Sequence, residues 1–188
     1  METVLILDFG AQYSQLIARR VREQNVYCEV KPCSISPAEI EKIAPIGIIL
    51  SGGPQSVYES VSPHVDPALF ALGIPVLGIC YGCQLMAYSL GGTVAAATEA
   101  TAREYGKTLT EFDTDCSIFQ GLPASSVTWM SHGDYISQVP DGFAVTAKTA
   151  VCPTAAMACP EKKLYGVQFH PEVQHTVEGS EMLRRFLY

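Results

Sequence analysis

The stretch "VLGICYGCQLMA" (Val76–Ala87) contains two patterns that meet at a cysteine. An apolar run typical of a buried strand precedes Cys80, and residues at helical spacing follow it. Gly78 and Gly82, two positions before and two after the cysteine, allow a tight backbone turn and leave room for a ligand. The stretch therefore predicts a strand that turns directly into a helix, with an exposed side chain at the turn.

Short apolar runs alternate with helical patterns on the amino-terminal side of this stretch. Strands are predicted at 4–9, 26–32, 46–50 and 75–79, and helices at 11–24, 36–43, 66–72 and 81–92. Strand–helix–strand connections of this length imply parallel strands and right-handed crossovers. The middle strands lack polar alternation, which indicates that helices cover both faces of the sheet.

After residue 92 the pattern changes to strands separated by turns. Strands are predicted at 93–97, 105–112, 126–130, 143–149, 154–159 and 164–169, followed by a last helix at 177–187. Some of these strands should extend the main sheet and others should form hairpins beside it. We therefore expect residues 1–188 to form a single α/β domain. Its central sheet should be mostly parallel with helices on both faces, and additional antiparallel strands should follow in the second half.

Composition and charge exclude several classes of protein. The 188 residues are 48% apolar and 16% charged, which is typical of a globular chain. The net charge of −7 argues against nucleic acid or an anionic membrane as the main partner. Apolar runs fall short of the ~20 residues that a membrane span needs. The first residues, "METVLILDFG", have no basic region or cleavage site, so we expect a cytoplasmic location.

Three loops should lie at one edge of the predicted sheet. In open α/β sheets, ligands bind beyond the carboxyl ends of the strands. "SGGPQS" (residues 51–56) follows the third strand, "CYGCQ" (80–84) follows the fourth, and "HPE" (170–172) follows the last. These loops are far apart in sequence, and we expect them to meet in space.

The residues of two of these loops suggest nucleophilic catalysis. A turn of this kind presents Cys80 as a nucleophile elbow does, and the following helix directs its N–H groups and positive dipole end at the sulfur, which favours the thiolate. A strand would deliver His170 to the same edge. In an extended chain Glu172 lies on the same side as His170 and can hold its tautomer. Cys80, His170 and Glu172 thus form a catalytic triad by role.

The glycine pair of "SGGP" is a candidate oxyanion hole. The backbone N–H groups of Gly53 and Tyr81 could stabilise negative charge on a substrate oxygen. A simple turn is the alternative interpretation of the same glycines.

The motifs "SGGP", "GICYGCQ" and "FHPE", at these distances, resemble those of class I glutamine amidotransferases. These enzymes use a Cys–His–Glu triad to release ammonia from glutamine. The resemblance covers nearly the whole chain and implies a flavodoxin-like amidotransferase domain. More narrowly, "ILDFGAQYSQLIARRVRE", "ILSGGPQSVYE" and "WMSHGD" resemble the amidotransferase domains of GMP synthetases.

The resemblance also implies roles for residues outside the triad. It places Gln84 against the substrate. Ser131, Gly133 and Asp134 would line the pocket for the α-amino and carboxylate groups of glutamine. His132, within the same "SHGD" motif, is expected to be structural because the triad histidine is already assigned.

The resemblance implies that this chain is the glutaminase component of GMP synthesis. Its partner would be an ATP-pyrophosphatase synthetase domain that uses the ammonia to convert XMP to GMP, and ATP and Mg²⁺ would bind there. "SGGPQS" lacks the aspartate of that domain's phosphate loop, and the sequence has no G-x-x-x-x-G-K-[ST] motif. We therefore expect no cofactor and no metal on this chain. The chain is expected to be either a separate subunit or part of a longer protein.

Other functions remain open at this point. Cys80 and Cys83 form a C-x-x-C pair, as in thiol–disulfide oxidoreductases, and that hypothesis makes Cys83 essential. A zinc site would need Cys80 and Cys83 with two of Cys152, Cys159 and His175, which lack a second close pair. A non-catalytic binding module would not need the triad. Within the amidotransferases, the alternatives are subunits that supply ammonia for anthranilate or carbamoyl phosphate synthesis.

Overall fold

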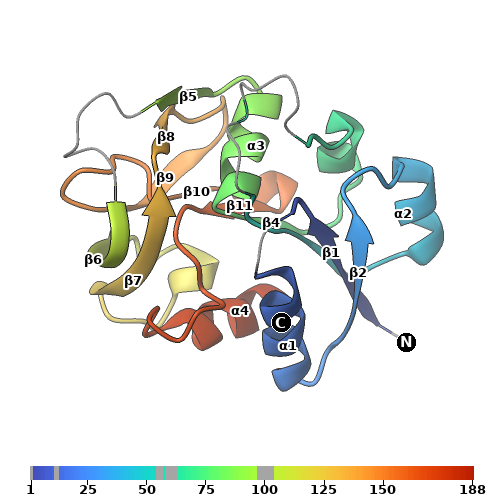
Figure 1. The fold of residues 1–188 in the computed structure, drawn as a ribbon, viewed down its shortest axis with the longest axis horizontal. Helices are drawn as coiled ribbons and strands as arrows, with labels where there is room; N and C mark the ends of the chain where they lie inside the picture. The colour runs from blue at the N-terminus through green and yellow to red at the C-terminus, as the bar shows by residue number, and fades with distance from the viewer. Residues whose placement is uncertain (1, 11–12, 54–56, 58–62, 97–103) are drawn as a thin grey trace.

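The computed structural model describes residues 2–10, 13–53, 57, 63–96 and 104–188 (Figure 1). Within these residues a nine-stranded sheet runs in the order β2-β1-β3-β4-β11-β10-β9-β6-β7. Its strands are β1 (Thr3–Asp8), β2 (Tyr27–Pro32), β3 (Gly47–Leu50), β4 (Val76–Ile79), β6 (Glu104–Phe112), β7 (Ser125–His132), β9 (Ala144–Lys148), β10 (Ala156–Cys159) and β11 (Leu164–Val167).

The sheet is parallel in one half and antiparallel in the other. The neighbours β2, β1, β3, β4 and β11 are all parallel. Beyond β11, the strands β10, β9, β6 and β7 pair antiparallel. This confirms the predicted mixed α/β sheet, in which the second half of the chain adds antiparallel strands.

A second, two-stranded antiparallel sheet lies beside the main one. It pairs β5 (Thr93–Ala96) with β8 (Asp134–Gln138). The sequence does not predict β8, because "DYISQ" places its two apolar residues side by side and so has no alternation.

Helices cover both faces of the main sheet, as predicted. On one face α1 (Ser14–Glu23) and α4 (Gly179–Leu187) bury Ile17 and Leu183 against alternate residues of β1 such as Ile6. On the other face lie α2 (Pro37–Ile43), α3 (Tyr81–Ser89) and the short 3₁₀ helix η1 (Pro67–Ala71), which pack against the intervening residues, such as Leu7. The β1 residues are therefore buried on both sides, which explains the absence of polar alternation.

The helix boundaries differ from prediction in three places. Residues 66–72 form the five-residue η1 and not an α-helix, although Asp66 caps it as expected through a 3.0 Å bond from the Ala68 N–H. The helix ends after these few residues because Gly73, just before β4, has a left-handed backbone conformation (φ 77°). The helix predicted at 81–92 ends at Ser89, and the last helix begins at Gly179.

The turn between β4 and α3 depends on its two glycines. A Cβ atom on Gly78 would lie 2.7 Å from the carbonyl carbon and oxygen of Gly82. A Cβ atom on Gly82 would lie 2.5 Å from the carbonyl oxygen of Leu50 in β3. The first turn of α3 thus packs directly on the backbone of β3 and β4. The expectation that these glycines leave room for a ligand is wrong, because protein backbone fills that space.

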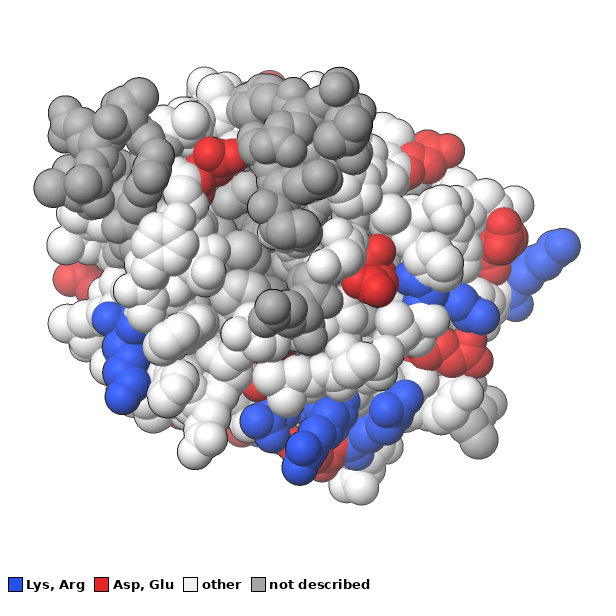
Figure 2. Space-filling view, viewed as in Figure 1, with Lys and Arg blue, Asp and Glu red and all other residues white. Residues whose placement is uncertain are grey.

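Charged side chains on the surface are mixed in sign. Figure 2 shows Lys and Arg beside Asp and Glu over α1 and α4. Arg19 pairs there with Glu23 at 3.4 Å, and Arg184 pairs with Glu181. Among the described helices, none is both long and apolar enough to cross a bilayer.

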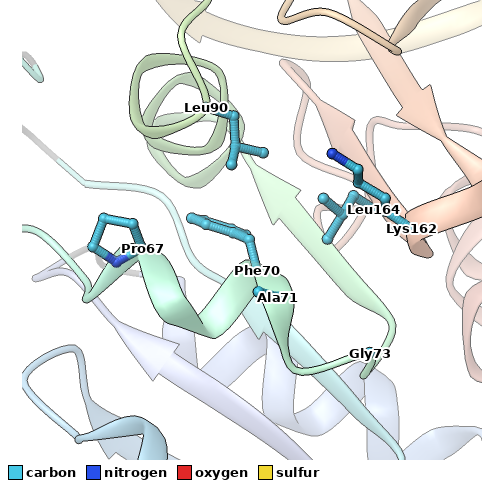
Figure 3. A pocket seen from close by; sticks show the side chains of 7 residues that line it. All are labelled: Pro67, Phe70, Ala71, Gly73, Leu90, Lys162 and Leu164. Carbon is cyan, nitrogen blue, oxygen red and sulfur yellow. The ribbon is translucent and has the colours of Figure 1, made fainter.

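A pocket of about 340 Å³ lies between η1, the end of α3 and the start of β11. Figure 3 shows Phe70 of η1 and Leu90 after α3 directed toward the same space, which Lys162 and Leu164 line from the other side. Because Leu164 opens β11, this pocket lies at the amino ends of the parallel strands. Ligands in this class of fold bind at the opposite edge.

We expect the Gly78→Ala variant to lose about 2–3 kcal/mol of unfolding free energy, because the added methyl group must displace backbone of α3. Gly47→Ala in the adjacent strand is the matched control, since its Cβ would meet the Phe186 ring at an ordinary 3.5 Å. Urea denaturation of both variants measures the difference. Equal stabilities would contradict this account of the turn.

Candidate active site

Three adjacent parallel strands bring the predicted loops together. β3, β4 and β11 are neighbours in the sheet, so their carboxyl ends lie side by side. Ser51–Gly53 continue from β3, Cys80 from β4, and the segment that carries His170 from β11. The topology therefore places residues 51–53, 80 and 170, which are distant in sequence, at one edge, as the sequence predicts.

Cys80 occupies the strained turn residue between β4 and α3. Its backbone has φ 54° and ψ −108°, a conformation that side-chain-bearing residues rarely adopt. It is the residue that precedes the first turn of α3, so the positive end of the helix faces it. Its sulfur lies 3.6 Å from the carbonyl oxygen of Ser131 and 3.6 Å from the Nε2 of Gln168.

His170 and Glu172 form a buried hydrogen-bonded pair. The Nδ1 of His170 lies 2.6 Å from the Oε1 of Glu172, and the carboxylate is 0% exposed. The backbone of His170 is fixed on both sides, because its N–H donates to Trp129 and its carbonyl accepts from Thr176. β11 ends at Val167, two residues earlier than predicted, and Glu172 lies in a turn. The two side chains meet although the chain between them is not an extended strand.

The surroundings of His170 favour its charged form. Burial lowers the pKa of the imidazole, since a low-dielectric interior disfavours charge. Hydrogen bonds to the side chains of Cys80 and Glu172, together with their negative charges, outweigh burial and raise this pKa from 6.5 to about 11. A protonated His170 stabilises a thiolate beside it, and Glu172 supplies the balancing charge on its far side.

The residues predicted to bind substrate lie around Cys80. Ser131 contributes its carbonyl oxygen near the sulfur, and Gly133 and Asp134 follow where β7 passes into β8. Gln84 is 4% exposed, and its amide nitrogen donates to the Asp134 carbonyl at 3.2 Å and to the Oε1 of Gln168 at 3.0 Å. Both N–H groups of Gln84 are therefore used within the protein.

His132 is buried, at 4% exposure, and its Nδ1 lies 2.8 Å from the Asp134 carbonyl oxygen. This contact fixes the corner between β7 and β8. The structural role expected from the sequence is consistent with this position.

The two residues of the predicted oxyanion hole are in contact. A Cβ atom on Gly53 would lie 3.1 Å from the ring of Tyr81, so the glycine backbone packs closely on this ring. The Tyr81 hydroxyl donates to the Pro63 carbonyl at 2.6 Å, and its ring lies 5.5 Å from that of Phe9. Pro54, the last residue of "SGGP", lies outside the described residues.

Cys80 is itself buried, at 7% exposure, so the prediction of an exposed side chain at the turn is wrong, and Cys83 lies deeper still. It is 0% exposed, and a Cβ atom on Gly166 would lie 2.6 Å from its sulfur. Burial raises the pKa of the Cys83 thiol well above its ordinary value, with smaller contributions from the charges of Cys80 and Cys152. All seven cysteines are free thiols. A core position of this kind does not favour the disulfide-exchange hypothesis, because an exchanging thiol needs access to its partner.

Gln168 and Tyr13 were not identified from the sequence. Gln168 is 0% exposed and donates to the Cys80 sulfur, and the ring of Tyr13 packs edge-on against the His170 ring at 5.5 Å between centroids. Gln168 stands two positions before His170, so the alternation applied to His170 and Glu172 could have identified it. Tyr13 immediately precedes α1, and its spacing in the sequence is that of a core-facing helical residue, so nothing in the pattern indicates a site.

Together these contacts support nucleophilic attack by sulfur. A cysteine at a helix start faces an imidazolium that a buried carboxylate orients. Such an arrangement can form a thioester with an amide carbonyl and can protonate the leaving nitrogen.

The sequence is similar to those of known amidotransferases. Residues 5–188 match the family model described as glutamine amidotransferase class-I. The glutamine-hydrolyzing GMP synthase of Clostridium botulinum (strain Alaska E43) is 56% identical over 187 residues, and that of Caldanaerobacter subterraneus subsp. tengcongensis is 58% identical over 187. Each match covers 100% of this chain and 36% of the relative, so the chain spans about a third of the length of these relatives.

Solved structures show the same fold. A Thermoplasma acidophilum protein, provisionally assigned as one of the subunits of a GMP synthase, has a TM-score of 0.85 and 31% identity, and the match covers 100% of this chain and 92% of that chain. A glutamine amidotransferase from Thermotoga maritima has a TM-score of 0.74 and 24% identity, covering 92% of this chain and 76% of that chain. At that identity the Thermotoga structure supports the fold alone.

We expect His170 to remain protonated well above neutral pH. The raised pKa also means that its contribution to stability is fully present below pH 6.5 and is lost as the pH rises through its folded-state value near 11. The Glu172→Gln variant should lower the pKa of His170 by roughly two units, because it removes the carboxylate charge. Nitrogen-15 NMR titration of the imidazole measures the shift.

Glu161→Gln is the control for this titration, since Glu161 is an exposed carboxylate that does not contact His170. It should leave the titration of His170 unchanged. A wild-type His170 that titrates near 6.5 would contradict the proposed charge distribution.

Proposed function

The chain belongs to the class I glutamine amidotransferase family, and we propose that its Cys80, His170 and Glu172 release ammonia from glutamine. The observation that carries this proposal is the 2.6 Å bond between His170 and the buried Glu172, on an imidazole whose pKa is raised by Cys80 and Glu172 together. This arrangement supplies both a nucleophile and a proton donor at one edge of the sheet.

In the first step the Cys80 thiolate attacks the side-chain carbonyl carbon of glutamine. A carbon–sulfur bond forms, and the carbonyl electrons move to the oxygen. His170 gives its proton to the amide nitrogen, the carbon–nitrogen bond breaks, and ammonia leaves. The product on the enzyme is a γ-glutamyl thioester. Glu172 keeps the imidazole of His170 oriented while the charge of the imidazole changes.

In the second step His170, now neutral, takes a proton from water. The resulting hydroxide attacks the thioester carbon, the carbon–sulfur bond breaks, and the sulfur leaves as a thiolate. The γ-carboxylic acid that forms loses its proton to water and leaves as glutamate, and His170 is again protonated, so the pair returns to its starting state.

Backbone groups next to Cys80 are proposed to stabilise the oxyanion of both steps. Gly53 and Tyr81 are in contact, and Tyr81 follows the nucleophile directly. One such donor contributes roughly 3 kcal/mol of transition-state stabilisation. Ser131, Gly133, Asp134 and Gln84 are proposed to hold the α-amino and carboxylate groups of glutamine.

We further propose that the ammonia serves GMP synthesis. The support is the 54–58% identity of the full chain to glutamine-hydrolyzing GMP synthases. Those relatives are much longer, and we assign the additional function to a synthetase domain or subunit that binds ATP, Mg²⁺ and XMP. No cofactor is proposed for this chain itself. A cytoplasmic location remains a prediction.

We predict that Cys80→Ala decreases glutamine hydrolysis about a thousandfold or more, because the nucleophile is lost. Cys83→Ala is the matched control, and it should retain most of the activity because Cys83 lies in the core. Glutamate release is the measurement. Hydroxylamine should trap the thioester as γ-glutamyl hydroxamate in the wild-type protein but not in Cys80→Ala. The opposite ranking of the two alanine variants would support disulfide chemistry instead.

A second prediction tests the synthetic pathway. With the synthetase part of a GMP synthase, ATP, Mg²⁺ and XMP, the wild-type chain should form GMP from glutamine. Cys80→Ala should fail with glutamine and succeed with added ammonium, because only ammonia release is lost. Glutamine hydrolysis without glutamine-dependent GMP formation would indicate an amidotransferase that serves another synthase, such as one making anthranilate or carbamoyl phosphate.

A further inference from the structure

Gln168 is a buried amide that contacts the sulfur of Cys80. Its side chain is 0% exposed, and its Nε2 lies 3.6 Å from the Cys80 sulfur. Its backbone is fixed as well, because its N–H donates to the Ala155 carbonyl at 2.7 Å. The amide therefore has little freedom to leave the sulfur.

The orientation of this amide is set by Gln84. Gln84 donates one N–H to the Asp134 carbonyl at 3.2 Å and the other to the Oε1 of Gln168 at 3.0 Å. Because the oxygen of Gln168 accepts from Gln84, its NH₂ group must face away from Gln84 and toward the sulfur. The two glutamines thus form a directed chain of hydrogen bonds that ends on Cys80.

The Ser131 carbonyl and the Gln168 amide favour different protonation states of the sulfur. The Ser131 carbonyl is an acceptor, so it binds the protonated thiol and offers nothing to a thiolate. The Gln168 N–H is a donor, and a donor binds an anion more strongly than a neutral sulfur. Gln168 therefore acts selectively on the charged form.

We propose that Gln168 stabilises the Cys80 thiolate through a fixed N–H donor, and that Gln84 is a positioning residue that acts through Gln168. This proposal rests on the proposed amidotransferase function for its place in the reaction. In the first step the donor favours the attacking thiolate. In the second step it stabilises the same sulfur as the carbon–sulfur bond breaks and the electron pair returns to it.

The test is the pH dependence of Cys80 alkylation by iodoacetamide, measured by mass spectrometry of the Cys80 peptide. Gln168→Met keeps the length of the side chain and removes the donor. The pH of half-maximal alkylation should rise by about one unit, the size expected for loss of one hydrogen bond to a charged group. Gln84→Met should shift it in the same direction by less, because the Gln168 donor remains but is no longer oriented.

Gln120→Met, at an exposed glutamine after Phe119, is the control and should leave the alkylation profile unchanged. If Gln168→Met fails to fold, Gln168→Asn carries the test, because it withdraws the donor by one methylene and should also raise the midpoint. An unchanged midpoint in a folded Gln168 variant overturns the proposal, even if glutamine hydrolysis falls, because that result indicates a structural role.

Alkylation does not depend on glutamine turnover. If the midpoint rises in the Gln168 variants while the wild-type chain releases no glutamate from glutamine, the amidotransferase function fails and the role of Gln168 stands. If glutamate is released and the midpoint of alkylation does not move, the amidotransferase function stands and the proposed role of Gln168 fails.

Discussion

The site depends on the close contact between the first turn of α3 and the strands beneath it. Gly78 and Gly82 let the helix backbone rest on β3 and β4, with no side chain between them. The chain can enter the helix at that distance only through a sharp turn, which places Cys80 at φ 54°. Backbone strain of this kind costs of order 1–3 kcal/mol and is held by the surrounding packing. The packing of two glycines thus determines where the sulfur lies.

Sheet topology then determines what the sulfur meets. Because β11 pairs parallel with β4 in register, with Val167 opposite Ile79, the residues after both strands emerge at the same edge. β7 reaches this edge from the antiparallel half of the sheet. Its Trp129 carbonyl holds the backbone of His170, and its Ser131 carbonyl contacts the sulfur. The antiparallel strands are therefore part of the site, although the nucleophile and the histidine both follow parallel strands.

Local patterns predict most of this arrangement, and the failures have physical causes. The cap at Ser36 and the strand-to-helix turn at Cys80 depend on neighbouring residues, so they can be identified in sequence. The strand β8 has no alternation, because its two apolar residues, Tyr135 and Ile136, are adjacent in the sequence. The local pattern misleads on the purpose of Gly78 and Gly82, since only the fold shows that backbone fills the space beside them. The chain from Gln84 to Gln168 joins residues 84 positions apart, and no local pattern indicates such a pairing.

Burial makes the triad a coupled unit. Cys80 and His170 are 7% and 5% exposed, and Glu172 is wholly buried, so water screens their charges poorly. The second carboxylate oxygen of Glu172, Oε2, has no hydrogen-bond partner within the described part of the chain. Its charge is thus compensated mainly through His170, and the charge of His170 is compensated by Glu172 and Cys80 together. Removing one member leaves a buried charge without its counterpart, which costs more than the lost contact alone. The raised pKa of His170 depends on both of its neighbours, Cys80 and Glu172, so a change at either residue alters the charge balance of the imidazole.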